Sequence, residues 1–396
     1  MKYKYEHLVV AYGSNLNDED WSNFCRRNGF SDNLLQFEGC VRLPDYALTF
    51  NHYSNSRGGG AANIQTAVGH FVEAALFSTS EEGLKALRCK EGHPSVYLET
   101  PVIAIKDDGS EVNALTYIVP PNKAQKYERP TREYYEICKL GYETYGLSTK
   151  NLSLAASGQK HEPLSTIFTY GTLMRGQPRH DAIAKYERQN KNVDFVLAGK
   201  VHGHLTTNGD FPGLDQNSDQ TTHGDLLRVS NIKDVLETAD RIEGFHSFGS
   251  PHNLFRRTLT HVCTGGFEPE LAWVYAFDGH LGKRVPSNDW RVHTRCKLRF
   301  YWGLVETYGQ YNPTFFERID DRWMNAENIN TNFFSGLVQN LCSGKLLERD
   351  LAAAAGVYAI WPKEGLISEN AAAFEKEFLT HLEYENDAFS RQKCYV

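Results

Sequence analysis

Two glutamates have the residue type and the spacing of proton-transfer groups. Glu91 follows Tyr12 by 79 residues, and Glu243 follows Tyr170 by 73 residues. Each glutamate precedes a glycine at the end of a segment with helical periodicity. Either one alone could be an exposed residue at a helix end. Paired with an anion-binding loop, a carboxylate is what proton transfer beside a carbonyl group requires. We therefore predict Glu91 and Glu243 as catalytic residues.

Both tyrosines begin a similar loop after an apolar run. Residues 9–16 read VVAYGSNL and residues 167–174 read IFTYGTLM. Successive backbone N–H groups at such a strand end can bind a carboxylate or a developing oxyanion, and the sequence does not separate these roles. Glycine allows close approach to the backbone, and the tyrosine could either pack in the core or contact substrate. The predicted binding residues are Tyr12, Gly13, Ser14, Asn15 and Leu16 in the first copy, and Tyr170, Gly171, Thr172 and Leu173 in the second.

The elements that must position these residues also occur twice. Residues 71–92 predict a strand and a short helix, with Thr79 and Glu82 in a capping-box pattern. Residues 224–244 repeat this order with Asn231 as the expected N-cap. Many short strands with few helices are typical of a small barrel or a curled sheet. Further strands are expected at 95–105, 114–119, 253–262 and 271–277.

These patterns predict an α+β fold with two tandem small mixed β-barrel domains and a helical C-terminal region. The first domain is expected at residues 1–150 and the second at 165–290. A small, polar stretch at 151–164 is the expected linker. Helical periodicity after Pro130 predicts a helix at the end of the first domain. The extension at 291–396 is also expected to be helical, and no chemistry is assigned to it.

Composition excludes several other classes of protein. The chain has 396 residues, 41% hydrophobic residues and a net charge of -7, without a long basic run, so we expect no nucleic-acid partner. The first residues are too polar for a signal peptide or a membrane span, which favours a cytoplasmic protein without a membrane partner. Eight cysteines contain no C-x-x-C pair, and His202 and His204 have no evident third ligand. We therefore predict no metal site. The oligomeric state is not readable from the sequence.

Both halves resemble the gamma-glutamyl cyclotransferase family. The first half, roughly residues 6–150, is similar to enzymes that act on gamma-glutamyl amino acids. Its shared segments are YGSNL (12–16), RLPDYALTF (42–50), Glu91-Gly92 and VYLETPV (96–102). The second half, roughly residues 165–290, resembles the gamma-glutamylamine cyclotransferase branch. Its shared segments are YGTLMRG (170–176), FPGL (211–214), Glu243-Gly244 and FRR (255–257).

This resemblance implies an intramolecular reaction on a small gamma-glutamyl substrate. The α-amine of the substrate attacks its own γ-carbonyl group, closes a five-membered ring and releases 5-oxoproline and a free amine. Ring closure has a large effective-molarity advantage, and no cofactor is implied. Glu91 or Glu243 would accept a proton from the α-amine and return it to the leaving amine, and partial burial should raise the pKa of either glutamate.

The resemblance also places supporting residues near each pocket. Tyr97 and Tyr117 match aromatic positions near the pocket of the family. Phe255 stands where the second branch usually has tyrosine, so a hydroxyl contact is absent there. Arg256 and Arg257 could bind a carboxylate or form a structural ion pair, and we include Arg257 among the predicted binding residues.

Three alternatives remain open. One domain could be catalytic while the other is retained for binding or packing. The whole chain could instead be a non-catalytic scaffold for a partner, because a fold alone does not guarantee activity. Hydrolysis or acyl transfer on another amide is disfavoured, since neither a Ser-His-Asp nor a Cys-His arrangement is legible. The identity of the leaving amine is not encoded in any readable motif.

Overall fold

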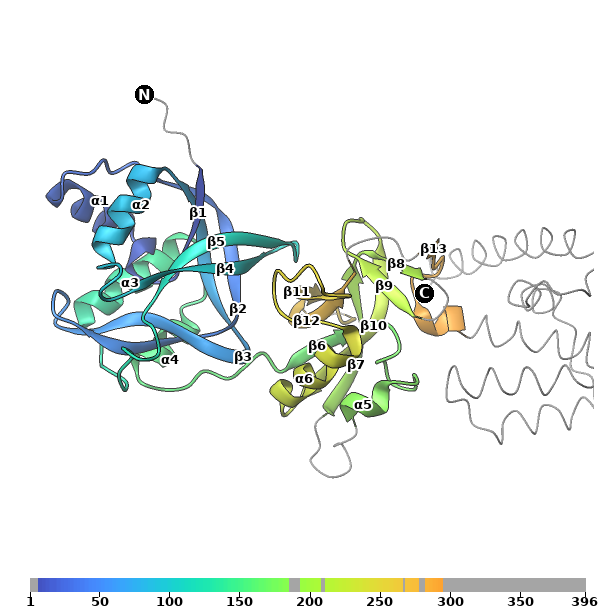
Figure 1. Cartoon of the computed structure of the whole chain (residues 1–396). Helices are drawn as coiled ribbons and strands as arrows, with labels where there is room; N and C mark the ends of the chain where they lie inside the picture. The colour runs from blue at the N-terminus through green and yellow to red at the C-terminus, as the bar shows by residue number, and fades with distance from the viewer. Residues whose placement is uncertain (1–5, 185–192, 208–210, 266–267, 278–281, 295–396) are drawn as a thin grey trace, which may run out of the picture. The chain divides into compact units, whose positions relative to one another are not determined.

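The computed structural model describes residues 6–184, 193–207, 211–265, 268–277 and 282–294 (Figure 1). The predicted helical extension lies outside the described residues from residue 295 onward. The chain divides into two compact units, each of which is described by itself. The first unit comprises Met1–Thr169, Ala182–Val201 and Asp225–Asp278, and the second comprises Tyr170–Asp181, His202–Gly224 and Gly279–Val396.

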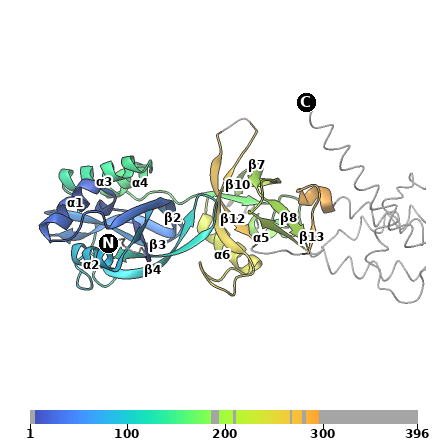
Figure 2. The ribbon, with the colours of Figure 1, turned by 90° about the horizontal axis from the view of Figure 1, so that it is seen from above.

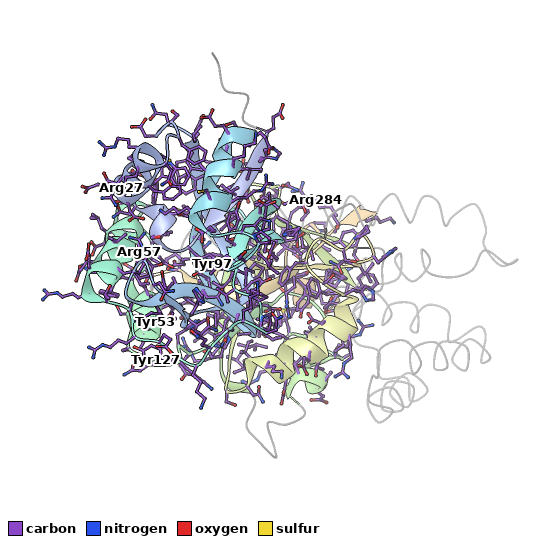
Figure 3. All side chains as sticks on the ribbon, turned by 60° about the vertical axis from the view of Figure 1, so that its left-hand side comes forward. Arg27, Tyr53, Arg57, Tyr97, Tyr127 and Arg284 are labelled. Carbon is purple, nitrogen blue, oxygen red and sulfur yellow. The ribbon has the colours of Figure 1, made fainter. Side chains whose placement is uncertain are left out.

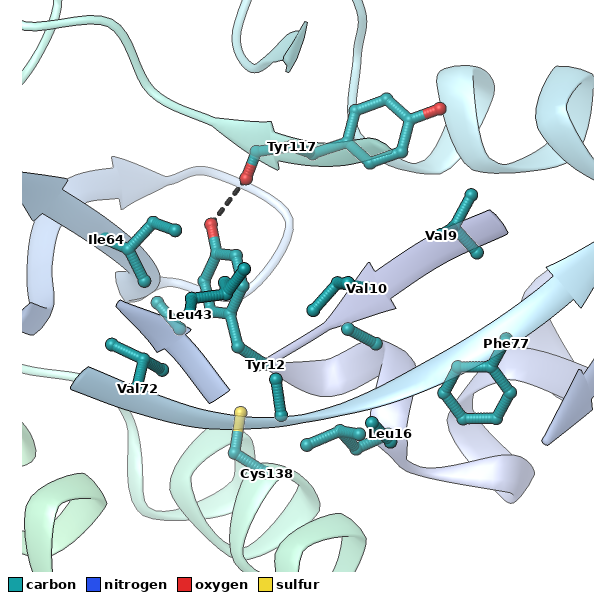
Figure 4. Close-up of a cluster of buried hydrophobic side chains, with 14 of the residues drawn as sticks. Val9, Val10, Tyr12, Leu16, Leu43, Ile64, Val72, Phe77, Tyr117 and Cys138 are labelled. Atoms are coloured by element: carbon teal, nitrogen blue, oxygen red, sulfur yellow. Dashed lines mark hydrogen bonds between the residues drawn. The ribbon is translucent and has the colours of Figure 1, made fainter. Parts of the chain in front are cut away.

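Five strands of the first copy form a closed barrel in the order β1-β3-β2-β4-β5. They are β1 (His7–Ala11), β2 (Leu35–Ser54), β3 (Gly59–Thr79), β4 (Leu98–Lys106) and β5 (Glu111–Ile118). The long β2 and β3 pair along nearly their whole length, with three register shifts that let the hairpin curl. Apolar side chains fill the barrel, and Figure 4 shows Leu43, Ile64 and Val72 around Tyr12. The barrel predicted for the first copy is confirmed.

Helices surround this barrel. They are η1 (Ser14–Leu16), α1 (Asp18–Arg27), α2 (Glu81–Lys90), α3 (Arg132–Thr144) and α4 (Lys150–Ala156). Figure 2 shows α3 and α4 along one side of β2 and β3, and α2 on the other side. The helix predicted after Pro130 is α3. Part of the predicted linker is also helical, because α4 buries Leu152 and Ala155 and packs on β2.

The start of α2 differs from the capping-box prediction by one residue. Ser80 is the N-cap, and its side chain accepts a hydrogen bond from the Gly83 N–H at 3.3 Å. Thr79 is instead the last residue of β3, and its buried hydroxyl donates to the Leu34 carbonyl at 2.7 Å. A residue held in the strand ladder is not available as a helix cap, so the helix begins one residue later.

The second copy repeats the central strands and the helix. Its five-stranded sheet has the order β11-β12-β6-β10-β7, and β13-β8-β9 form a separate sheet. The strands are β6 (Thr166–Thr169), β7 (Val193–His202), β8 (His204–Thr207), β9 (Pro212–Asp215), β10 (Thr221–Val229), β11 (Arg256–Val262), β12 (Glu270–Ala276) and β13 (Lys283–Arg284), and the helices are α5 (His180–Ala184) and α6 (Ile232–Glu243). Asn231 caps α6, as predicted. The α+β class is confirmed, although the described strands of this copy form two sheets where the first copy has one barrel.

Strand registers establish the duplication in detail. In the first copy Val9 of β1 pairs in parallel with Leu115 of β5, and in the second Ile167 of β6 pairs in parallel with Trp273 of β12. The number of residues along the chain between the two paired residues is the same in both copies. On the other side, β1 and β6 each pair antiparallel, with β3 and β10 respectively. Each motif strand therefore lies between one antiparallel and one parallel neighbour.

Candidate active site

A small cavity opens in the first copy where β1 ends. Its volume is about 40 Å³. It is lined by Val10, Ala11, Tyr12, Gly13, Ser14, Asn15, Ala62, Glu91, Tyr97, Thr116, Tyr117 and Tyr134. The structure thus brings together all the residues predicted for the first site except Leu16. Ala62, Thr116 and Tyr134 were not predicted from the sequence.

The first motif loop, residues 12–16, turns through a single 3₁₀ turn. The Leu16 N–H closes that turn by donating to the Gly13 carbonyl at 3.0 Å, and the Leu16 side chain is fully buried. Leu16 therefore anchors the loop in the core and does not line the cavity. The amides of Gly13, Ser14 and Asn15 precede the closed turn, where a helical segment offers them no acceptor, so they can donate to a bound oxygen.

Gly13 keeps the cavity open beside this loop. A Cβ atom built on Gly13 would point toward the Ala62 Cβ at 3.4 Å and the Tyr134 hydroxyl at 3.9 Å. Both of those residues line the cavity. The absence of a side chain at residue 13 therefore leaves room for substrate against the backbone.

Glu91 enters the cavity from the end of α2. Glu91 is the C-cap of that helix, and Gly92 with a φ of 60° ends it. The Asn15 Nδ2 donates to the Glu91 Oε1 at 2.6 Å. Burial raises the pKa of the Glu91 carboxyl group, and the Lys90 charge and the Asn15 hydrogen bond oppose that shift only in part. A carboxyl group with a raised pKa is better matched to an amine as proton acceptor.

A cluster of charged residues lies beside Glu91, and the sequence did not reveal it. Asp20 of α1 pairs with the Lys90 Nζ at 2.7 Å and with the Arg57 Nη2 at 2.7 Å. Burial acts to raise the pKa of Asp20, but the two cations outweigh it and the pKa of Asp20 is lowered. Arg57, from the β2–β3 hairpin (Figure 3), stands over the Tyr134 ring at 5.1 Å from its centroid. Two cations and one carboxylate leave one positive charge near Glu91.

Tyr12, Tyr97 and Tyr117 line the cavity, and their hydroxyl groups are bonded within the protein. The Tyr12 hydroxyl donates to the Tyr117 carbonyl, and the Tyr117 ring points away from it (Figure 4). The Tyr97 hydroxyl donates to the Ala62 carbonyl at 2.7 Å. The Tyr117 hydroxyl donates to the Glu99 Oε2 at 2.9 Å. Burial raises the pKa of all three tyrosines, so they stay protonated.

The second motif loop, residues 170–174, closes the same turn although three of its five residues differ from those of the first. The Met174 N–H donates to the Gly171 carbonyl at 3.0 Å, as Leu16 does to Gly13 in the first copy. Leu173 therefore corresponds to Asn15. The Leu173 side chain is buried and has no hydrogen-bond donor. This copy lacks the amide side chain that contacts the glutamate in the first copy.

The second motif loop packs on β9. The Tyr170 hydroxyl accepts a hydrogen bond from the Leu214 N–H at 3.2 Å. A Cβ atom on Gly171 would lie 2.7 Å from the Pro212 Cγ, so glycine is needed for this close approach. Thr172 accepts a backbone hydrogen bond from the Arg179 N–H at 2.9 Å.

Glu243 is the last residue of α6 and is half-buried. Gly244, with a left-handed φ of 63°, ends the helix directly after it, as Gly92 does after Glu91. Glu243 belongs to the first compact unit and the second motif loop to the other. A second active site formed by the two remains a prediction.

Arg257 is buried among residues of the second copy, and its Nη2 also pairs with Asp45 of β2. Only 2% of its side chain is exposed, and its Nη1 pairs with the Asp240 Oδ2 at 2.9 Å. Its guanidinium group also stands over the Phe245 ring at 4.7 Å. These are the contacts of the structural ion pair, and a substrate contact of Arg257 remains a prediction. Phe255 is buried beside Phe277, with 5.4 Å between the ring centroids.

Within the part of the chain that the structure describes, no group of three or more His, Cys, Asp or Glu residues could hold a metal ion. His204 lies 3.9 Å from the Asp215 carboxylate. No helix in that part is long and apolar enough to span a membrane.

A family model described as "Gamma-glutamyl cyclotransferase, AIG2-like" matches the chain twice, at residues 9–136 and 167–292. The two matched segments together span more than half of the chain. The protein therefore belongs to this family and carries it as a tandem duplication. A search of curated protein sequences found no match.

Several solved structures are similar to parts of the chain. One described as gamma-glutamyl cyclotransferase is 24% identical, with a TM-score of 0.33, covering 40% of this chain and 88% of that chain. An AIG2-like protein from Mus musculus is 21% identical, with a TM-score of 0.24, covering 30% and 86%. YkqA from Bacillus subtilis is 14% identical, with a TM-score of 0.27, and covers 70% of this chain and 86% of its own.

Proposed function

We propose that this protein cleaves a gamma-glutamyl amide by cyclisation and releases 5-oxoproline and a free amine. The observation that carries the proposal is the shared cavity of Glu91 and the first motif loop, in which Asn15 touches the Glu91 carboxyl group at 2.6 Å. A proton acceptor and a set of oxygen-binding amides lie on one small pocket. This combination serves attack of an amine on a carbonyl group.

Each group in the pocket has a role in the proposed reaction. The α-ammonium group of the substrate gives a proton to Glu91, and the freed amine forms a C–N bond to the γ-carbonyl carbon. The amides of Gly13, Ser14 and Asn15 hold a substrate carboxylate or the oxyanion. When the old C–N amide bond breaks, Glu91 returns this proton to the leaving nitrogen, and the second proton lost by the new ring nitrogen completes the leaving group as an ammonium ion. The raised pKa of Glu91 favours the first transfer, because it makes the carboxylate a stronger base.

A second candidate function assigns catalysis to the first copy alone. Leu173 stands in the second motif loop where the first has Asn15, so the second glutamate lacks the same hydrogen-bond donor. The second copy would then bind a ligand or pack without turnover. This candidate differs from the first in the expected effect of changing Glu243.

The test is release of 5-oxoproline from a panel of gamma-glutamyl compounds by wild type and by Glu91→Gln, Glu243→Gln and the double variant. Loss of a general acid/base group is expected to lower the rate about 10²–10⁴-fold at the affected site. Two active copies predict a partial loss from each single change. One active copy predicts that Glu91→Gln alone removes activity.

Glu82→Gln is the matched control, because Glu82 lies on the same helix but does not line the cavity. It should keep the wild-type rate. If folded wild-type protein releases no 5-oxoproline from any compound of the panel, the enzyme proposal is wrong and a non-catalytic scaffold takes its place.

A further inference from the structure

The helix that carries the glutamate is joined to the returning strand by an ion pair in both copies. In the first copy Arg88 of α2 donates two hydrogen bonds to the Glu99 carboxylate of β4, from Nε at 2.8 Å and from Nη2 at 2.9 Å. In the second copy Asp240 of α6 pairs with Arg257 of β11 at 2.9 Å. The cation lies on the helix in one copy and on the strand in the other.

Strand register shows that these two pairs are equivalent. Glu99 lies opposite Tyr117 in the β4–β5 ladder, and Arg257 lies opposite Tyr275 in the β11–β12 ladder. Each tyrosine is two residues beyond the residue that pairs in parallel with the motif strand, Leu115 or Trp273. On the helix side, Arg88 and Asp240 each precede the glutamate by three residues. The same positions therefore hold opposite charges.

In both copies a tyrosine hydroxyl donates to the carboxylate of the ion pair, whether that carboxylate lies on the strand or on the helix. The Tyr117 hydroxyl donates to the strand carboxylate of Glu99 at 2.9 Å. The Tyr275 hydroxyl donates to the helix carboxylate of Asp240 at 2.6 Å. Each copy thus contains a helix residue, a strand residue and a tyrosine from the next strand, joined by charge-assisted hydrogen bonds. The duplicated unit has kept this three-residue connection while its charges have exchanged places.

The connection holds the helix end that delivers the glutamate. Residues three apart lie on the same side of a helix, so Arg88 is one turn from Glu91. The strand partner Glu99 is 17% exposed and the helix partner Arg88 34% exposed, and Glu81 at 3.2 Å from Arg88 is an exposed additional partner. The Glu99 N–H also donates to the His93 Nδ1 at 3.1 Å, which ties the segment after Glu91 to the same strand.

We infer that Arg88, Glu99 and Tyr117 are positioning residues that hold Glu91 at the first motif loop, and that Asp240, Arg257 and Tyr275 do the same for Glu243 with reversed polarity. This inference rests on the proposed function for its catalytic consequence. A displacement of about 1 Å at a reacting group can cost about 10²-fold in rate, so loss of the connection should appear in kcat more than in KM.

The inference is tested in the full-length protein by giving the first copy the charge arrangement of the second. In a Glu243→Gln background, which isolates the first copy, Arg88→Asp alone places a carboxylate against Glu99 and should lower kcat by about 10-fold to 100-fold. Arg88→Asp combined with Glu99→Arg gives the first copy the polarity of the second and should restore most of kcat. The matched control is Arg42, which pairs with Asp107 at 2.7 Å away from α2. Arg42→Asp, with and without Asp107→Arg, should leave kcat unchanged.

A second readout is the titration of the Glu91 carboxyl carbon by NMR in the free protein. In folded Arg88→Gln, which adds no negative charge beside Glu91, the pKa of Glu91 should fall toward the ordinary glutamate value, because the carboxyl group loses its buried place. The double exchange of Arg88 and Glu99 should keep the wild-type titration. This titration needs no turnover. If wild type releases no 5-oxoproline, the proposed function fails while the titration still decides the positioning.

Two outcomes would overturn the inference. One is a folded Arg88→Asp variant with the kcat of its background, together with a folded Arg88→Gln variant that has a wild-type Glu91 titration. The other is a folded double variant that recovers neither. If the single variant does not fold, Arg88→Gln replaces it, and the double variant alone still decides whether reversed polarity positions Glu91.

Discussion

Asn15 and Glu91 define the first site at the scale of single residues. Their hydrogen bond at 2.6 Å joins the motif loop to the helix end across 76 residues of chain. Asn15 stabilises the charged form of the carboxyl group, whereas burial stabilises its neutral form. The balance of these two effects, together with the nearby Lys90, Arg57 and Asp20 charges, sets the pH range in which Glu91 can accept a proton.

Asn15→Leu should therefore shift the pH profile in a defined direction. Removing the donor raises the pKa of Glu91 further, because burial then acts with less opposition. The reaction needs the ionised carboxylate, so the acid limb of kcat/KM for the free enzyme should move to higher pH. The profile is measured with a gamma-glutamyl compound that wild type accepts. A limb that stays in place, or moves to lower pH, would contradict this role of Asn15.

At the scale of elements, α3 holds the motif loop against the barrel. The helix buries Tyr134, Cys138, Gly141 and Tyr142, which follow a helical repeat on one side. A Cβ atom on Gly141 would lie 2.6 Å from the Leu16 Cβ and 2.7 Å from the Leu16 carbonyl carbon. This contact sets how closely the helix approaches the loop.

Gly141→Ala should consequently harm both stability and activity. Alanine gains about 1 kcal/mol over glycine in helix propensity, but overpacking against backbone costs about 1–3 kcal/mol, so the net change is expected to be destabilising. The displaced loop should also lower kcat. Leu140→Ala is the control, because Leu140 is 53% exposed on the same helix. Denaturant unfolding and 5-oxoproline release measure the two effects, and a Gly141→Ala variant as stable as the control would show that the contact relaxes without cost.

At the scale of the whole molecule, the two copies are equivalent in register but unequal in their motif loops. The first has Asn15 and the second has Leu173 at the same place in the turn. If this difference limits the turnover rate of the second copy, the chain has one fast site and one slow or inactive site.

Leu173→Asn in a Glu91→Gln background tests whether this residue makes the two copies differ in rate. The added amide should raise the residual rate by about 10-fold to 100-fold, since a hydrogen bond to a charged group contributes about 1.5–3 kcal/mol. Leu173→Ala in the same background is the control for lost packing at this buried position. Equal rates for the two variants, with both folded by circular dichroism, would mean that the amide side chain is not what separates the copies.

The sequence alone determined the repeated order of elements, the strand positions, the helix after Pro130 and the family. These features depend on local periodicity, turn residues and motif order, which are written along the chain. Tertiary structure alone decided that Leu16 anchors the loop, that the Tyr117 hydroxyl binds Glu99, and that Asp20 joins Arg57 to Lys90 beside the cavity. Each of these contacts joins elements that are distant in sequence or depends on which way a side chain points once the barrel closes. Periodicity predicts the elements but carries no information about those directions. The spacing of the two glutamates was therefore visible in the sequence, whereas the residues that contact them are known only from the folded chain.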